Sequence, residues 1–249
     1  MGNKQDMKKK IKQALISVSD KSNLKLILKI LKKYKIEIIS SGGTYKKIKK
    51  MGYYCREVSE FTKSPEILGG RVKTLHPKIY GGILNRIDIK KDLDTLKKLD
   101  ILSIDLVVIN LYNFSETINN TNNQDRIIEN IDIGGPTLIR ATAKNYKFKT
   151  IITDPDDYEK LLNQLNVNSS TSLDFRFYLA KKAFELTSYY DSVIFNWYNK
   201  DNNKSDHLPN TFSFNLKKHI AMRYGENPHQ KADLLTFSNL EHKNIANAD

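Results

Sequence analysis

Two cations, a hydroxyl and an imidazole fall within the segment Gly69-Gly70-Arg71-Val72-Lys73-Thr74-Leu75-His76-Pro77. The glycine pair lets the backbone approach a ligand without a Cβ in the way. Arg71 offers a planar fork of donors that fits phosphate or carboxylate, and Lys73 adds a compact charge. If the segment is extended, Val72 points away and the two cations share one side. The segment therefore predicts an anion site, with a basic surface loop as the alternative.

Two further segments combine hydroxyls or glycines with the start of an expected helix. Ser17 to Lys21 brings two serines and an ammonium together, and Ser41-Gly42-Gly43-Thr44 forms a second such turn. Backbone N–H groups at a helix start bind phosphate with help from the helix dipole. A glycine turn with a threonine cap is the simpler interpretation of Ser41 to Thr44. Neither the P-loop spacing nor the dinucleotide-binding glycine pattern occurs, so we expect no ATP hydrolysis.

Polar side chains also follow or interrupt apolar stretches later in the chain. Asn110 could contact a base or an amide, and Tyr112 could donate or accept a hydrogen bond, although a turn with a packed aromatic is the alternative. Asp132 lies between two isoleucines ahead of Gly134-Gly135-Pro136. It either caps the next helix or works as a functional carboxylate.

Composition narrows the class of protein. The chain has 249 residues, a net charge of +13 and one cysteine, Cys55, so an intrachain disulfide and a cysteine-based metal cluster are excluded. No apolar run approaches the roughly 18 residues that span a bilayer, and no signal-peptide pattern follows the basic start. The lysines are scattered beside Ile and Leu at helical spacing, which indicates solvated helix faces rather than a nucleic-acid site. We expect a cytoplasmic protein that binds neither nucleic acid nor membrane.

Apolar runs and helical periodicity alternate along most of the chain. Strands are predicted at residues 14–18, 36–39, 53–58, 106–109 and 150–152, and helices near 24–31, 44–51, 92–99, 136–144 and 155–165. This alternation predicts an α/β layer fold with a mainly parallel sheet. Residues 173–198 form a long aromatic-rich helix, interpreted as a packing helix or a subunit interface.

Several of these motifs occur together in one known family. In order, they are SVSDK, SSGGT, GGRVKTLHP, NLYNF, IDIGGPT and ATAKN. Over about Ala14 to Tyr198 the chain resembles the IMP cyclohydrolase domain of the bifunctional purine biosynthesis protein. It departs from the family pattern at Asn113, where proline is usual, and at Ser40 and Thr142, where alanine is common.

The resemblance implies a three-layer, methylglyoxal-synthase-like α/β fold and a ring closure. The family closes 5-formamidoimidazole-4-carboxamide ribotide to IMP with loss of water. Such a reaction needs a phosphate anchor, a group that stabilises the oxyanion and a proton shuttle, but no metal and no redox cofactor.

The resemblance also implies roles for individual residues. The catalytic residues would be Lys73, Tyr112, Asp132 and Lys144, with Asp132 paired to Lys144. The nucleotide would be bound by Ser19, Asp20, Lys21, Ser41, Gly42, Gly43, Thr44, Arg71, Val72, Thr74, Ile109, Asn110, Ile133 and Gly134. His76, before a proline, is interpreted as structural.

A second region follows a polar stretch. Met222 to Gln230 resembles the opening motif of the same family's formyltransferase domain, in which Arg223 and Tyr224 would bind the aminoimidazole ribotide. We predict a cyclohydrolase domain at residues 1–200, a linker at 201–211 and a truncated second domain at 212–249. The missing part would use 10-formyltetrahydrofolate as co-substrate, so no transformylase activity is expected. The resemblance further implies a homodimer.

Three alternatives remain open. A phosphate-eliminating lyase of the methylglyoxal-synthase-like superfamily would keep the fold and change the chemistry. A regulatory domain would bind inosinate without turnover. A basic nucleic-acid-binding protein would show binding that falls steeply with salt.

Overall fold

A computed structural model of the chain describes residues 10–200, 211, 213–214 and 216–237. Its contacts divide the chain into two units, Met1–Thr187 and Ser188–Asp249, which are described separately. The predicted linker at 201–211 lies almost wholly outside the described residues. The predicted domain boundaries therefore stay a prediction.

The first unit is built on a five-stranded sheet with the strand order β3-β2-β1-β4-β5, in which every pairing is parallel. The strands are β1 (Gln13–Val18), β2 (Glu37–Ser40), β3 (Arg56–Glu57), β4 (Leu106–Asn110) and β5 (Thr150–Ile152). The central strands β1 and β4 are buried along almost their whole length, as expected for a parallel sheet covered on both faces. The predicted α/β fold with a parallel sheet is confirmed.

The third strand is shorter than predicted. β3 is an edge strand that pairs with β2 only at Ile39 and Ser40, so two residues complete its ladder. Directly after it, α3 (Val58–Thr62) turns back and buries Val58 and Phe61.

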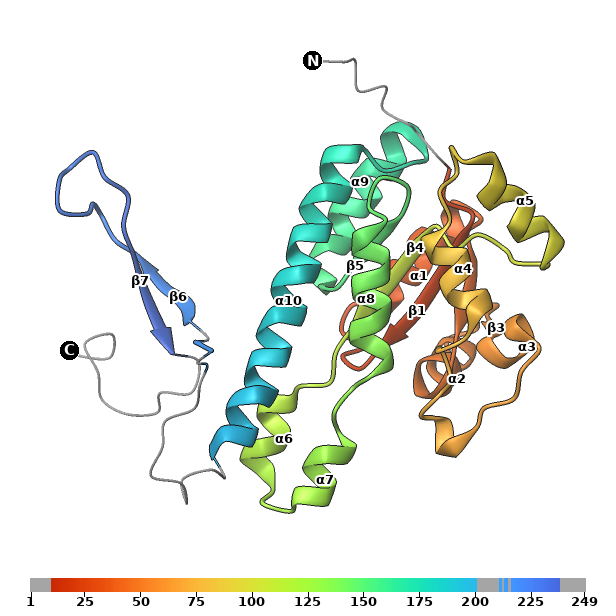
Figure 1. The fold of residues 1–249 in the computed structure, drawn as a ribbon. Coiled ribbons are helices and arrows are strands. Elements are labelled where there is room, and N and C mark those ends of the chain that lie inside the picture. Colours follow the sequence, from red (N-terminus) through yellow and green to blue (C-terminus); the bar gives the residue numbers. More distant parts are fainter. Residues whose placement is uncertain (1–9, 201–210, 212, 215, 238–249) are drawn as a thin grey trace. The chain divides into compact units, whose positions relative to one another are not determined.

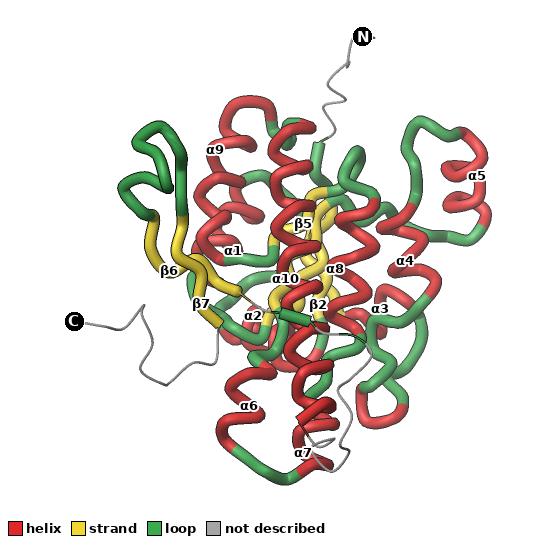
Figure 2. Tube along the Cα trace, turned by 60° about the vertical axis from the view of Figure 1, so that its left-hand side comes forward, coloured by secondary structure: helices red, strands yellow, loops and turns green. Residues whose placement is uncertain are grey.

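Helices cover both faces of this sheet (Figures 1 and 2). They include α1 (Leu24–Lys33), α2 (Gly42–Lys50), α4 (Pro77–Leu84), α8 (Gly134–Lys144) and α9 (Tyr158–Asn168), while α5 (Lys90–Lys98) lies beside α4 at the periphery (Figures 1 and 2). The connections β1–α1–β2 and β4–α8–β5 advance along the sheet in opposite directions. Because such crossovers are right-handed, α1 and α8 lie on opposite faces, which gives three layers. α9 packs on α1, and α4 packs on α8.

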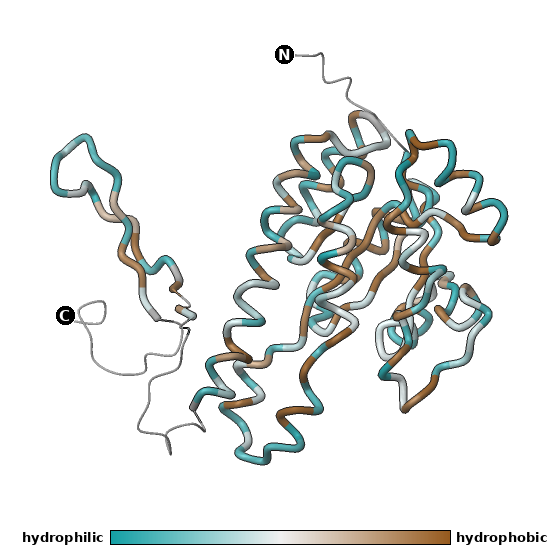
Figure 3. Tube along the Cα trace, viewed as in Figure 1, coloured by the Kyte–Doolittle hydropathy of each residue, from teal (hydrophilic) through white to brown (hydrophobic). Residues whose placement is uncertain are grey.

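The helices form because their apolar residues recur at helical spacing. In α1, Leu24, Ile27, Leu28 and Leu31 are each no more than 2% exposed, while the four lysines of the helix lie among its more exposed positions. Figure 3 shows the same pattern along the chain, with hydrophobic residues concentrated on the strands and hydrophilic ones at the periphery. The scattered positive charge is therefore largely a property of solvated helix faces.

The helices α3 and α4 were not predicted, and neither were two short helices, α6 (Phe114–Asn120) and α7 (Gln124–Glu129). α6 and α7 follow one another between β4 and α8. Each begins after an asparagine whose side chain accepts a backbone hydrogen bond: Asn113 from Glu116 N at 3.3 Å, and Asn123 from Arg126 N at 2.9 Å. These caps satisfy N–H groups that a helix start leaves unpaired. Asn113 thus has a structural role at the start of α6.

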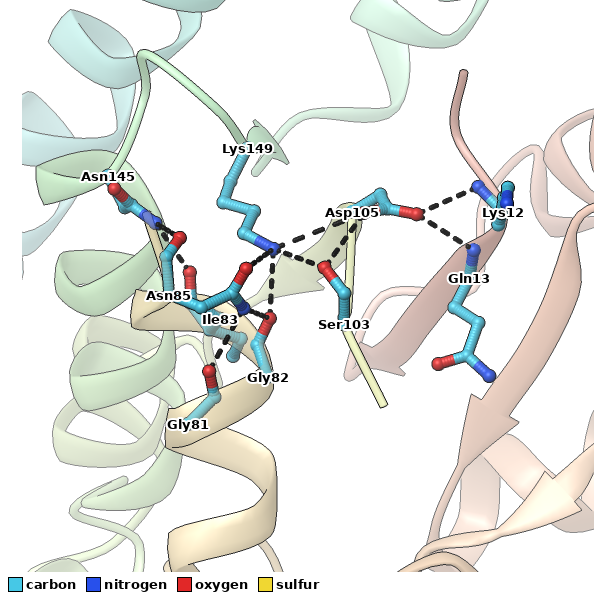
Figure 4. Close-up of polar contacts among 10 residues, drawn as sticks. All are labelled: Lys12, Gln13, Gly81, Gly82, Ile83, Asn85, Ser103, Asp105, Asn145 and Lys149. Atoms are coloured by element: carbon cyan, nitrogen blue, oxygen red, sulfur yellow. Dashed lines mark hydrogen bonds and ion pairs between the residues drawn. The ribbon is translucent and has the colours of Figure 1, made fainter. Parts of the chain in front are cut away.

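A buried lysine joins the amino-terminal ends of three strands (Figure 4). Lys149, directly before β5, is 1% exposed, and its Nζ donates to Gly82 O at 2.9 Å and to Ser103 Oγ at 2.8 Å. It also lies 4.0 Å from the carboxylate of Asp105, directly before β4. Asp105 in turn accepts from the backbone N–H of Lys12 at 2.9 Å, at the start of β1. One charge pair therefore fixes β1, β4 and β5 at the same edge.

Side chains of the same cluster cap the C-terminal end of α4. Asn85 Nδ2 donates to Gly82 O at 2.6 Å, and Asn145 Nδ2 donates to Ile83 O at 2.8 Å (Figure 4). Together with Lys149, these amides satisfy carbonyls that the last turn of a helix leaves unpaired. Side chains from the α8–β5 connection thus hold α4 in place.

A long C-terminal helix, α10 (Leu173–Lys200), runs through the boundary between the units. In the first unit Leu179, Ala180 and Ala183 are buried in the core, whereas Phe177 is 58% exposed. The described part of the second unit contains an antiparallel hairpin of β6 (Leu216–Ala221) and β7 (Asp233–Phe237). Across the described residues of both units, no helix is long and apolar enough to span a bilayer.

The cluster around Lys149 gives a stability prediction. Lys149→Met keeps the length of the side chain but leaves Asp105 buried without its cation, so the free energy of unfolding should fall by about 3–5 kcal/mol. Lys147→Met, at an exposed position in the same connection, should change it by less than about 0.5 kcal/mol. Urea denaturation measures both. Equal stabilities of the two variants would show that the cluster does not hold the strands.

Candidate active site

A pocket of about 660 Å³ lies at the carboxyl-terminal edge of the sheet. Residues after β1, β2 and β4 line it, together with segments 69–74 and 128–135 from the connections outside the sheet. In the sheet, β2 and β4 lie on opposite sides of β1, so the direction of the strand order reverses there. Ligands of open α/β sheets bind at such a switch point. The volume suits a small molecule.

The Gly69–Gly70 segment enters the pocket as a turn. Leu68–Gly70 form one turn of 3-10 helix, and Gly69 and Gly70 have φ values of 63° and 89°, which favour glycine. Arg71 continues in a right-handed helical conformation. The extended conformation considered for this segment is not adopted, because two left-handed glycines turn the chain. Arg71 and Lys73 still both line the pocket, and Val72 does not.

Lys73 lies across two glycines from separate loops. A Cβ on Gly70 would come within 2.3 Å of Lys73 Cε, and a Cβ on Gly42 within 3.0 Å of Lys73 Nζ. Any larger residue at Gly70 would displace the lysine. The ammonium is also 3.6 Å from the carboxylate of Glu66. The glycines thus provide the space that places Lys73 over the start of α2.

Two helix N-termini line the same pocket. α2 begins after Ser41, and α8 begins at Gly134. Unpaired N–H groups and the helix dipole make such ends favourable for anions. Pro136, in the first turn of α8, has no N–H to leave unpaired there.

Asp132 contacts the start of α8 and also lies on the pocket. Its Oδ1 accepts from Gly135 N at 2.8 Å, so it caps the first turn of α8, and the residue also lines the pocket. Burial raises the pKa of the Asp132 carboxyl above its ordinary value, while the Gly135 N–H opposes that shift. A carboxyl with a raised pKa is a better proton acceptor near neutral pH than an exposed one.

Some predicted ligand-binding side chains are engaged by the protein itself. The amide oxygen of Asn110 accepts from Ser19 N at 2.6 Å and Asp20 N at 3.0 Å, and its nitrogen donates to Asp20 O at 2.9 Å. Thr44 Oγ1 donates to Val18 O at 3.0 Å and accepts from Val18 N at 3.1 Å. Asn110 keeps one N–H for a ligand, whereas Thr44 can offer chiefly its backbone N–H.

Arg71 has an acidic partner that the sequence did not reveal. Its Nε donates to Glu129 Oε1 at 3.2 Å, and its Nη2 contacts Glu129 Oε2. Glu129 ends α7 and lines the pocket, and its contact raises the pKa of the Arg71 guanidinium. The signal available in sequence was weak, namely an acidic residue shortly before the IDIGG motif.

Comparison with known proteins identifies the family. Residues 23–137 match a family model described as an MGS-like domain, and residues 142–249 match one described as AICARFT/IMPCHase bienzyme. The chain is 50% identical over 242 residues to the bifunctional purine biosynthesis protein PurH of Caldicellulosiruptor bescii, covering 95% of this chain and 46% of that protein.

The PurH of Persephonella marina is 47% identical over 238 residues, covering 96% of this chain and 46% of that protein. The chain belongs to the PurH family. It spans just under half the length of these PurH relatives. Among solved structures, the crystal structure of ForH is similar with a TM-score of 0.65 and 30% identity, covering 74% of this chain and 97% of that one.

Most of the site residues implied by the PurH resemblance line one pocket. They are Ser19, Lys21, Ser41, Gly42, Gly43, Thr44, Arg71, Lys73, Thr74, Ile109, Asn110, Tyr112, Asp132, Ile133 and Gly134. Asp20, Val72 and Lys144 do not line it. The pocket lining also contains Ser17, Gly69 and Gly70 from the predicted anion-binding segments, and residues that were not predicted, namely Val18, Ile128, Glu129, Asn130, Ile131, Gly135 and Leu138. The roles implied for the predicted residues stay predictions.

The predicted pair of Asp132 and Lys144 does not form in this structure. Asp132 precedes α8, and Lys144 is the last residue of that helix and is exposed. At about 1.5 Å of rise per residue, the helix separates its two ends by about 15 Å, too far for contact. The predicted pairing of Asp132 with Lys144 is therefore wrong.

His76 has the structural place predicted for it. Its Nδ1 accepts from Lys78 N at 3.1 Å and so caps α4. In the second unit, Arg223 and Tyr224 lie in the connection between β6 and β7, where Gly225 N donates to Gln230 O at 2.9 Å. Among the residues that the structure describes, no group of three His, Cys, Asp or Glu side chains could hold a metal ion.

Asp132 gives a prediction for stability against pH. Its pKa in the folded protein is raised by burial, so the ionised carboxylate lowers stability as pH rises through the range above the ordinary value of 3.8. Asp132→Asn can keep the bond from Gly135 N and carries no charge. The variant should therefore melt at a higher temperature than the wild type at pH 7, and the difference should shrink toward pH 4.

Thermal melts across this pH range measure the effect. Asp94→Asn, which removes an exposed carboxylate on α5, should show no comparable trend. A variant at Asp132 that is less stable at pH 7 would contradict the assignment of burial as the dominant influence.

Proposed function

We propose that this chain is an IMP cyclohydrolase, which closes 5-formamidoimidazole-4-carboxamide ribotide to IMP with loss of water. The observation that carries the proposal is the joint placement of Lys73, Asp132 and the start of α2 on one pocket. These supply a cation, a carboxylate and an anion-binding helix end, and such groups suit a phosphorylated substrate that must gain and lose protons.

The phosphate is proposed to bind at the start of α2. Ser41 precedes that helix, and Lys21 and Arg71 line the same pocket. Anchoring the phosphate fixes the rest of the nucleotide relative to Lys73 and Asp132. Ring closure within one molecule depends strongly on such orientation.

Ring closure then requires charge stabilisation and proton transfer. The carboxamide nitrogen forms a bond to the formyl carbon, and the formyl oxygen, which gains negative charge, later leaves as water. In this proposal Lys73 stabilises the developing oxyanion, Asp132 accepts a proton from the carboxamide nitrogen, and Tyr112 hydrogen-bonds to the oxygen that leaves. That oxygen takes up two protons, one released by the carboxamide nitrogen and one by the formamide nitrogen, as its bond to the former formyl carbon breaks. Lys144 is given no role, because it lies at the far end of α8.

Further properties follow from the family. We propose that the protein acts as a cytoplasmic homodimer with the nucleotide as its small-molecule ligand. Use of 10-formyltetrahydrofolate is proposed only for a longer protein that contains the remainder of the second domain. Sedimentation of the purified chain would test the homodimer.

Turnover tests the function directly. The purified protein should convert the formamido ribotide to IMP, followed by ultraviolet absorbance, and Lys73→Ala should lower kcat by about 10²-fold. Lys98→Ala removes the same charge from an exposed position on α5 and should leave kcat unchanged. Binding of IMP with no turnover would instead support a regulatory nucleotide-binding domain.

The neighbouring glycines Gly69 and Gly70 allow a matched test of the position of Lys73. Gly69 and Gly70 both have positive φ, so either change to alanine strains the backbone and costs about 1 kcal/mol of stability. A Cβ at Gly69 has open space, whereas one at Gly70 collides with Lys73. Gly70→Ala should therefore lower kcat by about 10²-fold, as small misplacements do, and Gly69→Ala by much less. Equal losses would show that the placement of Lys73 is not limiting.

A further inference from the structure

Each of the two cations contributed by the Gly69–Gly70 segment faces an acidic side chain of the same chain. Arg71 contacts Glu129 through two nitrogens, with Nε to Oε1 at 3.2 Å, and Lys73 Nζ lies 3.6 Å from Glu66 Oε2. The two pairs differ in geometry. The contact with Glu66 is single and long, and Glu66 does not line the pocket, whereas Glu129 does. Glu129 is therefore the acid that meets a ligand.

The contact of Glu129 with Arg71 resembles the one a phosphate would make. A guanidinium presents Nε and one terminal nitrogen as a parallel fork, and carboxylates and phosphates both bind that fork with two oxygens. Glu129 engages this edge of Arg71. A phosphate that is to use the same edge must first displace Glu129.

The exposure of this pair makes the exchange feasible. The side chains of Arg71 and Glu129 are 68% and 58% exposed. Ion pairs at such positions contribute little to stability, so a phosphate with more charge can replace the carboxylate. Glu129 would then remain close to the bound phosphate and repel it, an effect that salt screens.

We propose that Glu129 is an internal counter-anion that competes with the ligand's phosphate for Arg71 and thereby limits the affinity of the pocket for phosphorylated nucleotides. Weaker binding of this kind also speeds release of a phosphorylated product. The inference rests on the proposed function in taking the ligand to be a nucleoside monophosphate. The competition itself requires only a phosphate group.

Calorimetric binding of IMP and of inosine to the full chain tests this inference. Glu129→Gln keeps the shape of the side chain and removes its charge, so it should bind IMP about two- to fivefold more tightly than the wild type. Inosine, which has no phosphate, should bind equally to both proteins. The gain for IMP should shrink as salt is raised.

Asp125→Asn is the matched control. It removes one negative charge from an exposed position on the same helix, outside the pocket lining, and should bind IMP as the wild type does. A gain of equal size in this control would overturn the proposal, because it would reflect net charge alone.

The Arg71→Ala variant provides a second background, which tests whether Glu129 acts through Arg71. In Arg71→Ala at raised salt, adding Glu129→Gln should change IMP binding by less than about twofold, since the competition no longer exists and salt screens the remaining repulsion. If Glu129→Gln in the native background weakens IMP binding or leaves it unchanged, Glu129 instead positions Arg71 or does nothing, and the proposal is wrong.

The outcomes separate this inference from the proposed function. Tighter IMP binding by Glu129→Gln, in a wild-type protein without turnover, would uphold the competition and reject the cyclohydrolase activity. Normal turnover by the wild type, with no change in IMP binding by Glu129→Gln, would uphold the cyclohydrolase activity and reject the competition. If neither IMP nor ribose 5-phosphate binds to the wild type or to Glu129→Gln, the proposal fails as well.

Discussion

The contact between Lys149 and the Ser103–Asp105 segment is the constraint on which the rest of the first unit depends. The Lys149 ammonium has no access to water, so its charge is stabilised by Gly82 O, Ser103 Oγ and the Asp105 carboxylate. Because Asp105 also accepts a hydrogen bond from the backbone N–H of Lys12, the starts of β1, β4 and β5 are fixed to one another. Because these parallel strands are aligned at their amino-terminal ends, their carboxyl-terminal ends also lie in register. The pocket lies at those carboxyl-terminal ends.

The same constraint reaches the pocket through α4. Lys149 and Asn145 hold the last carbonyls of this helix, while His76 caps its first turn. The segment that carries Arg71 and Lys73 leads directly into that first turn. Fixing α4 at its far end therefore limits where these cations can lie, and the glycines at 42 and 70 leave the space that Lys73 fills.

The pocket balances its charges within the chain. Arg71 is paired with Glu129 and Lys73 faces Glu66, while Asp132 is buried at the start of α8, where burial raises its pKa. A site with two unopposed cations would bind any anion strongly. Acidic neighbours reduce that general attraction, so a ligand must offer shape and hydrogen bonds as well as charge. The proposed competition by Glu129 follows from this balance.

The sequence by itself determined the strand runs, the α/β class and the inventory of reactive groups, because apolar periodicity and motif chemistry are local. It also identified most of the residues that line the pocket. Only the tertiary structure decided that residues 69–73 form a turn rather than an extended segment, that Lys144 lies a helix length from Asp132, and that Glu129 meets Arg71. These contacts join segments that are distant in the chain, or depend on the direction of a helix, and such geometry arises only when the elements pack.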